Sequence, residues 1–268
     1  MRAWIVATAF AFFASVVSAQ DSMRLAVTTS FHNSGLADIL LPRIAQDLDL
    51  TVQLLVVGTG QALRLGQAGD VDAILVHARG AEDAFVAAGH ASHRRDIMYN
   101  DFVIVGPATD PARVQDAATI HAALSAIARS RAPFVSRGDD SGTHKKELAL
   151  WAGAGLEPAT FDPWYKAVGA GMGAALNTAS GLNAYILADR ASWLNFGNTG
   201  DLALLFSGDP DLFNQYGYLP VNPDRHPHVR HDHASRLEEW LTSDTAKRLI
   251  NGYRINGETL FTFNAVPG

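Results

Sequence analysis

Three short segments of the sequence combine serine or threonine with glycine in a pattern that suits anion binding. The pattern around each segment indicates a buried strand before it and a helix after it. The first turn of a helix has unpaired backbone N–H donors and carries a partial positive charge. The segments therefore predict donors that converge on one negatively charged ligand. They are residues 28–35 (TTSFHNSG), 58–60 (GTG) and 136–143 (SRGDDSGT).

The third segment carries the most chemistry. Arg137 is the only Lys or Arg in the three segments, and its planar guanidinium can donate two charge-assisted bonds to one oxyanion. Gly142 lets a ligand approach the backbone closely, and the hydroxyls of Ser141 and Thr143 add donors. Together the segments predict a site built almost entirely of hydrogen-bond donors.

Each feature also has an ordinary structural explanation. A serine or threonine before a helix is often only its N-cap, and a glycine between strand and helix is often only part of a turn. Arg137 could instead pair at the surface with Asp139 or Asp140. Three such segments in one α/β chain favour the binding interpretation over three unrelated caps.

At these segments the sequence resembles the tungstate-binding proteins of ABC importers, which belong to the two-lobed type II periplasmic binding superfamily. The resemblance implies a hinged cleft between two lobes, which holds the oxyanion through the Thr-Thr-Ser turn, Thr59, Arg137 and the Ser-Gly-Thr turn. The stretches that carry it are 25–42 (LAVTTSFHNSGLADILLP), 57–78 (VGTGQALRLGQAGDVDAILVHA), 98–112 (MYNDFVIVGPATDPA), 136–151 (SRGDDSGTHKKELALW), 171–179 (GMGAALNTA) and 185–194 (YILADRASWL).

Two positions depart from the family pattern. Val27 stands where the family usually has a threonine, and Ala175 stands where it tends to have a hydroxyl residue. Either change removes a donor or repacks a wall. From the segments and the resemblance together, the candidate oxyanion-binding residues are Thr29, Ser30, Thr59, Ser136, Arg137, Ser141, Gly142 and Thr143.

The elements that must position these residues alternate along the chain. Strands are expected at 24–28, 51–57, 71–77, 100–107, 133–136 and 216–221, and helices at 36–44, 60–69, 120–129, 142–152, after Gly171 and at 234–251. Pro42 is expected to kink or split the first helix. The alternation predicts an α/β fold of two lobes, each a mostly parallel sheet wrapped by helices. Residues 20–105 with 216–268 are expected to form lobe 1 and residues 106–215 lobe 2, with the strands near 102–106 and 216–221 crossing between them as a hinge.

The first nineteen residues have the anatomy of a cleaved signal peptide. Arg2 precedes a long apolar run, and the small residues before Gln20 predict cleavage after Ala19. The sequence has no cysteine, which excludes disulfides, thiolate metal sites and a lipid-anchoring cysteine. We therefore expect a periplasmic location. The net charge of −6 argues against nucleic acid as a partner.

The favoured function is a monomeric periplasmic binding protein that delivers tungstate, with molybdate also possible, to an ABC-type permease and its ATPase. Two alternatives stay open, a phosphate or sulfate carrier and an anion sensor coupled to a membrane receptor. Asp139 and Asp140 are expected to point away from the ligand, capping N–H groups or pairing with Lys145 or Lys146. No cofactor is expected.

Two other interpretations, an enzyme and a metal site, have less support in the sequence. An enzyme is not expected, because the sequence has neither a Gly-x-Ser-x-Gly elbow nor a phosphate-binding loop of the GxxxxGK[ST] type. The stretch 224–233 (DRHPHVRHDH) is dense in possible zinc or nickel ligands, but its proline and arginines favour a solvated loop with no metal.

Overall fold

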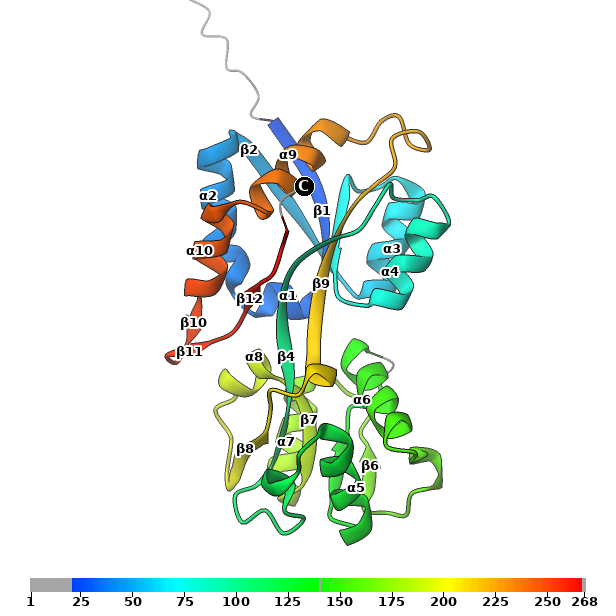
Figure 1. The fold of residues 1–268 in the computed structure, drawn as a ribbon, viewed down its shortest axis with the longest axis vertical. Coiled ribbons are helices and arrows are strands. Elements are labelled where there is room, and N and C mark those ends of the chain that lie inside the picture. The colour runs from blue at the N-terminus through cyan, green and yellow to red at the C-terminus, as the bar shows by residue number, and fades with distance from the viewer. Residues whose placement is uncertain (1–20, 140, 267–268) are drawn as a thin grey trace, which may run out of the picture.

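The structure is a computed structural model that describes residues 21–139 and 141–266. The predicted signal peptide, residues 1–19, lies outside the described residues. Figure 1 shows two bodies, here called the upper and the lower body, joined by two long neighbouring strands, β4 (Arg95–Pro107) and β9 (Phe213–Pro220). The upper body contains both the beginning and the end of the described chain.

The upper body is built on a sheet in the order β2-β1-β3-β9-β4. The first three strands are parallel to one another, whereas β9 and the first half of β4 run antiparallel to their neighbours. Its other strands are β1 (Asp21–Thr28), β2 (Leu50–Val57), β3 (Ala73–Val76), β12 (Thr262–Phe263), which pairs with β4, and a small separate hairpin of β10 (Arg254–Ile255) and β11 (Glu258–Thr259).

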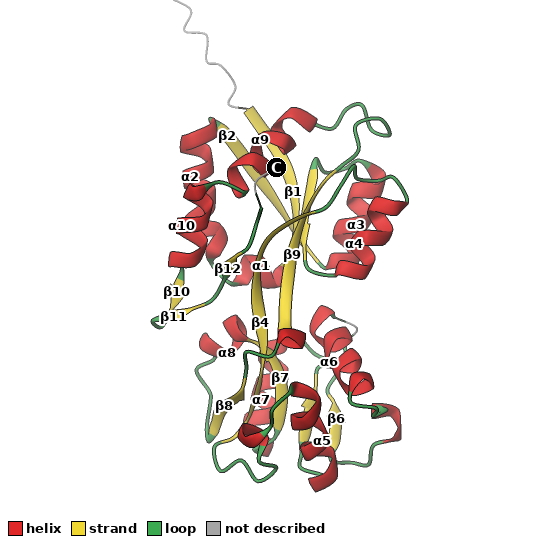
Figure 2. Cartoon of the chain, in the orientation of Figure 1, coloured by secondary structure: helices red, strands yellow, loops and turns green. Residues whose placement is uncertain are grey.

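Alternation along β1 sends apolar side chains to both faces of the upper sheet. Leu25 and Val27 pack against one group of helices, and Ala26 packs against the other. The first group is α2 (Leu36–Leu48), α9 (His231–Leu241) and α10 (Asp244–Gly252), and the second is α3 (Thr59–Ala68) and α4 (Arg79–Ala87). Both faces are therefore covered, as Figure 2 shows.

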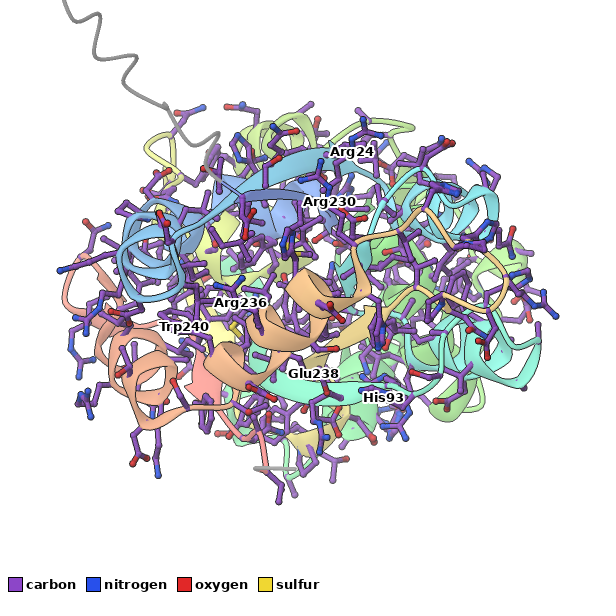
Figure 3. The ribbon with its side chains drawn as sticks, turned by 90° about the horizontal axis from the view of Figure 1, so that it is seen from above. Arg24, His93, Arg230, Arg236, Glu238 and Trp240 are labelled. Carbon is purple, nitrogen blue, oxygen red and sulfur yellow. The ribbon has the colours of Figure 1, made fainter. Side chains whose placement is uncertain are left out.

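Polar contacts fix α9 on the upper body, as seen from above in Figure 3. Glu238 accepts hydrogen bonds from His93 at 2.8 Å and from Arg95 at 3.0 Å. Trp240 donates its indole N–H to Asp47 at 2.8 Å. Helix α9 is thus tied to residues that lie more than a hundred positions earlier in the chain.

The lower body repeats the plan with a smaller sheet. The second half of β4 pairs antiparallel with β7 and β8, and β7, β5 and β6 are parallel neighbours. The strands are β5 (Phe134–Ser136), β6 (Tyr165–Ala167), β7 (Tyr185–Asp189) and β8 (Leu202–Phe206). The main helices are α5 (Ile120–Ser130) and α6 (Gly142–Gly153) on one face, α7 (Met172–Leu182) on the other, and the short α8 (Arg190–Leu194).

The predicted fold class is confirmed: the chain is α/β, with two bodies, helices on the sheet faces and two strands that cross between the bodies. The second crossing lies earlier than expected. Phe213 is already opposite Asp101 and Tyr218 is opposite Arg95, so most of β9 belongs to the upper sheet. The chain therefore enters the upper body at the beginning of β9, a few residues before 216–221.

Two helix predictions need correction. Pro42 does not split its helix, because α2 continues through it to Leu48. Pro42 is exposed, as is Asp38 one turn earlier, so water can bond the Asp38 carbonyl that proline leaves without an N–H partner. The predicted helix at 234–251 is two helices, since α9 ends at Leu241 and Ser243 caps α10 by accepting the Ala246 N–H. Within the described residues, no helix has the length and apolarity that crossing a bilayer requires.

Candidate functional site

The predicted turns lie where the two bodies face each other. The parallel strands β1, β2 and β3 end at the lower edge of the upper sheet, and α1 (Thr29–Asn33) and α3 begin there. Across the gap, α6 begins at the top of the lower body. Helix starts from both bodies therefore point N–H groups toward the space between them.

The upper side of the gap is organised around Ser30. Its hydroxyl oxygen lies 3.0 Å from the hydroxyl of Thr28 and 2.9 Å from His77 Nε2. Thr28 caps α1 by accepting the Phe31 N–H at 3.3 Å, so the N-cap explanation holds for this residue. Thr29 is exposed at the start of α1. Ser30 is partly buried, and its hydroxyl belongs to a network rather than to solvent.

Thr59 begins α3 on the same side of the gap. It is the first helical residue after Gly58, which adopts an extended conformation, and its side chain is partly exposed. The Gly58 carbonyl already accepts the Ala62 N–H, as expected at a helix start. Thr59 thus presents a hydroxyl and a first-turn N–H at the edge where β1 also ends.

His77 is a site residue that sequence reasoning did not identify. It follows β3 directly, bonds Ser30 and packs its ring 4.8 Å from the ring of Tyr216 on β9. Burial lowers the pKa of His77 to about 4, although hydrogen bonds to its own backbone and to Asn214 act in the opposite direction. His77 is therefore a neutral imidazole at neutral pH. Its position at the carboxyl end of a parallel strand, like the three turns, was the signal that could have found it.

The hinge strands form the floor beside His77. Asn214 on β9 donates its amide N–H to the side-chain oxygen of Asn100 on β4 at 2.8 Å, and both residues are buried. Tyr216 has its pKa raised mainly by burial and keeps its phenolic proton. The floor is polar and carries no formal charge of its own at these three residues.

On the lower side, Arg137 is enclosed rather than solvated. Its side chain is 17% exposed; one guanidinium N–H donates to Asp139 at 2.5 Å and another approaches the Thr143 hydroxyl at 3.5 Å. The alternative pairing with Asp139 is therefore present. The same contacts hold Arg137 over the first turn of α6, next to Thr143.

Asp139 behaves partly as expected. One carboxylate oxygen accepts the Ser141 N–H at 3.3 Å, which confirms the predicted capping. The other carboxylate oxygen accepts a hydrogen bond from Arg137. The Arg137 pair and the Ser141 bonds lower the Asp139 pKa against the opposing effect of burial. Asp140 lies outside the described residues.

The start of α6 faces His77 directly. Ser141 caps the helix by accepting the His144 N–H at 3.3 Å, and Gly142 is the first helical residue. A methyl group on Gly142 would stand 3.4 Å from His77 Cε1. Residues 141–143 of the lower body and the Ser30–His77 pair of the upper body are thus on opposite sides of one narrow gap.

Ser136 is the candidate residue that the structure does not bring to this gap. It is fully buried, and its hydroxyl lies beside Glu147 and Tyr165 in the interior of the lower body. Burial raises the pKa of Glu147 to about 7, even though hydrogen bonds from Tyr165 and Trp151 favour the ionised form. The Ser136 hydroxyl has no hydrogen-bond partner among the described residues.

The two departures from the family pattern lie in the cores. Val27 is fully buried in the upper core, and Ala175 is fully buried in the lower core on the inner face of α7. Both side chains pack away from the gap. Their replacement of hydroxyl residues therefore alters packing and removes no donor from the space between the bodies.

A pocket of about 230 Å³ opens between the bodies beside Ser30. Its walls include Asn33 of the upper body and Gly173, Asp189 and Ser192 of the lower body. Asp189 is a second carboxylate near the site, which the sequence analysis did not consider. One of its oxygens accepts the Ser192 N–H at 2.9 Å and so caps α8.

The histidine-rich stretch 224–233 packs on the upper body. His226 donates to the Gln67 carbonyl at 3.0 Å, and His228 donates to the Gly69 carbonyl at 2.9 Å. The described residues contain no cluster of three histidine, aspartate or glutamate side chains placed to hold a metal ion. These two hydrogen bonds hold the loop of residues 224–233 against the end of α3.

The chain matches the family model described as PBP superfamily domain over residues 16–245. The tungstate-binding protein TupA of Peptoclostridium acidaminophilum is 45% identical over 251 residues, covering 92% of this chain and 87% of that protein. The solved structure of the tungstate binding protein TupA from Desulfovibrio alaskensis G20 is 42% identical, with a TM-score of 0.88 and coverage of 92% and 100%. The tungstate ABC transporter structure from Geobacter sulfurreducens is 46% identical, with a TM-score of 0.78 and coverage of 88% and 100%.

Proposed function

Because this chain belongs to the PBP superfamily and to the family of the tungstate-binding proteins, we propose that it captures a tetrahedral oxyanion, tungstate, for an ABC importer. Like these relatives, it is a binding protein and not an enzyme. The observation that carries the proposal is the opposition of Ser30 and His77 to the start of α6 across one gap. The ligand is the cargo, and no other cofactor is involved.

The donors around the gap suit an anion without protons. Tungstate is a dianion near neutral pH, so all four of its oxygens accept hydrogen bonds. Ser30 and Thr59 from one body, and Arg137, Ser141 and the Gly142–Thr143 backbone from the other, supply hydroxyl, guanidinium and amide donors. These donors bond the oxygens of the ligand, and no side chain ligates the metal atom.

The cycle of the proposed carrier is a population shift between open and closed forms. We infer that the two bodies are the two lobes of this cycle, predicted as residues 20–105 with 216–268 and residues 106–215, with the return to the upper body moved to the beginning of β9. The strands β4 and β9 connect them as the hinge. A ligand that bonds donors of both lobes stabilises the closed form over the open one. We infer that the closed form, a periplasmic monomer, is recognised by a permease that acts with its ATPase.

Phosphate is the informative competitor. It keeps at least one proton near neutral pH and needs an acceptor, and an unpaired buried group costs about 1–3 kcal/mol. Both Asp139 oxygens already accept bonds from Arg137 and Ser141. Asp189 is the one described carboxylate of the pocket walls, and its capping of α8 occupies one oxygen. We therefore expect phosphate to be rejected.

The test is titration calorimetry with tungstate, molybdate, sulfate and phosphate at pH 7.5, followed by tungstate titration in a large excess of phosphate. We expect tight binding of tungstate, comparable or weaker binding of molybdate, and no displacement by phosphate. Displacement by phosphate at a concentration similar to tungstate would replace the proposal with a phosphate carrier. In that case Asp189→Asn should abolish phosphate binding, which identifies the acceptor.

A further inference from the structure

A buried ion pair lies next to the segment that carries His77. Glu82 on α4 and Arg94, which precedes β4, are paired, and their side chains are 0% and 5% exposed. The other carboxylate oxygen of Glu82 accepts the backbone N–H of Ala78, the residue that follows His77. The pair is thus bonded directly to the backbone beside a residue of the gap.

The backbone around His77 is held on both sides. Val76, the last residue of β3, pairs with Gly217 of β9. Ala78 donates its N–H to Glu82 and precedes the first helical residue of α4. His77 is the single residue between these two attachments, so the position of its ring depends on where they place the backbone.

The ring of His77 reaches both sides of the gap. Its Nε2 lies 2.9 Å from the Ser30 hydroxyl of the upper body, and this contact holds Ser30 whichever group is the donor. A methyl group on Gly142 of the lower body would stand 3.4 Å from its Cε1. A displacement of the His77 backbone therefore changes the position of a proposed ligand donor and the width of the gap together.

Helix capping explains only part of this arrangement. A glutamate in the first turn of a helix can accept the backbone N–H of the residue before the helix, as Glu82 does. Such a cap requires no arginine. Here Arg94 donates both to Glu82 and to Asp96 on β4. The Glu82 carboxylate is therefore fixed to the sheet and not only to its own helix.

The ion pair has little to offer to stability alone. Removing two charges from water costs about as much as their attraction returns, so a buried pair is often no more stabilising than apolar side chains of similar volume. Arg94 also has one buried nitrogen, Nη2, with no hydrogen-bond partner among the described residues, which adds a cost. Burial raises the pKa of Glu82, and Arg94 acts in the opposite direction. What the pair supplies is a fixed acceptor for the Ala78 N–H.

The space that the pair occupies exists because residue 217 is glycine. A methyl group on Gly217 would stand 2.5 Å from a carboxylate oxygen of Glu82 and 2.6 Å from Nε of Arg94. Cβ atoms do not approach other heavy atoms so closely. Since Gly217 is also the sheet partner of Val76, the pair packs directly against the strands that hold His77 from the other side.

We propose that Glu82, held by Arg94, is a positioning residue for His77. By fixing the Ala78 N–H, it sets the place of the imidazole ring against Ser30 and the start of α6. This inference rests on the proposed function, in which those groups bind the oxyanion. Glu82 is fully buried and does not touch the ligand, so it acts on tungstate affinity through His77.

The variant Glu82→Gln separates the two bonds of the carboxylate. Its amide has one acceptor oxygen for two donors, and the charged Arg94 is the stronger donor. The amide NH2 then faces the Ala78 N–H, which loses its acceptor. One neutral hydrogen bond corresponds to about twofold to tenfold in affinity, so calorimetry at pH 7.5 should show tungstate binding weakened by about that factor.

A double-mutant cycle with His77→Ala tests whether the effect passes through the ring. If Glu82 acts through His77, the loss caused by Glu82→Gln disappears once residue 77 is alanine, because there is no ring left to place. A structural role alone would give the same fold loss in both backgrounds. Hydrogen exchange of the Ala78 amide, measured by NMR, should become faster with Glu82→Gln in either background.

The matched control is Glu238→Gln. Glu238 is also buried, at 8% exposed, and accepts hydrogen bonds from His93 and Arg95. It lies on α9, at the end of the upper body away from the gap, where it is seen from above in Figure 3. Glu238→Gln should lose stability in urea and keep the tungstate affinity of the parent.

Gly217→Ala keeps the proposal testable if Glu82→Gln does not fold. The added methyl group displaces both members of the ion pair and removes no charge. It should weaken tungstate binding in the parent and have no such effect in the His77→Ala background.

The outcomes separate this proposal from the function on which it rests. A tungstate affinity of Glu82→Gln equal to that of the parent overturns the positioning role and leaves the function intact. An equal fold loss with and without the His77 ring assigns the effect to the fold as a whole and also overturns the role. A loss of affinity without faster exchange at Ala78 overturns the stated route. Absence of tungstate binding by the parent overturns the proposed function itself.

Discussion

Replacing Arg137 with alanine tests the charged part of the proposed site most directly. The guanidinium is held by Asp139 at 2.5 Å and by Thr143 at 3.5 Å, and only 17% of the side chain is exposed. A hydrogen bond to a charged group contributes about 1.5–3 kcal/mol, and each 1.4 kcal/mol changes an affinity tenfold. Arg137→Ala should therefore weaken tungstate binding by roughly tenfold to 150-fold.

We expect the loss of tungstate affinity to lie at the upper end of this range because of Asp139. In Arg137→Ala its carboxylate keeps the Ser141 N–H but loses its positive partner, which leaves an uncompensated negative charge near the ligand. The double variant Arg137→Ala/Asp139→Asn removes that charge as well and should recover part of the loss. Asp139→Asn alone should change affinity only slightly, because the amide oxygen can still accept one of the two bonds.

The assay is tungstate calorimetry at pH 8. Arg137→Lys is the matched control, since lysine keeps the charge but loses the planar fork and should fall between the parent and alanine. Urea denaturation should show that Arg137→Ala still unfolds in one cooperative transition, which separates a loss of binding from a loss of the fold. An Arg137→Ala protein with the tungstate Kd of the parent would refute the assignment.

Three further predictions concern neighbouring features. Thr59→Val keeps the shape but loses one neutral donor, so tungstate affinity should fall about fivefold by calorimetry, and an unchanged Kd would remove Thr59 from the site. Between pH 4.5 and 7 the parent should lose about 3 kcal/mol of unfolding free energy in urea relative to Glu147→Gln, because folded Glu147 keeps its proton up to about pH 7 and unfolding releases it. This loss should be absent below pH 4.5 and complete above pH 7; a pH-independent difference would contradict it. Replacing His226 and His228 with Gln should leave tungstate affinity unchanged with or without zinc, whereas metal-dependent recovery of binding would show a metal role.

The fold could be predicted from the sequence because its signals are local. Apolar runs bounded by glycine give the strands and helices, and the positions of Gly58 and Gly69 mark the start and end of α3. Pro42 was misleading, since the exposed side of a helix tolerates a lost backbone bond that a buried side does not. The position of the crossing in β9 depends on pairing with β4, which no local pattern reports.

The site was only partly predictable for a similar reason. Arg137 and the start of α6 follow from one continuous segment, so the sequence identifies them. His77 meets Ser30 because β3 pairs with β1, and it meets Gly142 because the two bodies face each other. Neither relation appears in the spacing of residues along the chain. Ser136 was included because it begins the same segment, but the end of β5 turns its side chain into the lower body.

Two of the proposed donors already have hydrogen-bond partners in this structure, and this bears on how the site achieves selectivity. Ser30 is bonded to His77, and Arg137 is bonded to Asp139, each within its own body. A ligand must replace these bonds, so each donor contributes the difference between two hydrogen bonds rather than the full value of one. An anion with too few acceptor sites cannot compensate for the bonds it breaks, and a protonated anion adds a donor that finds no free acceptor. Discrimination therefore arises from the free-energy cost of exchanging these hydrogen bonds, and a fully ionised ligand such as tungstate recovers that cost because all of its oxygens accept.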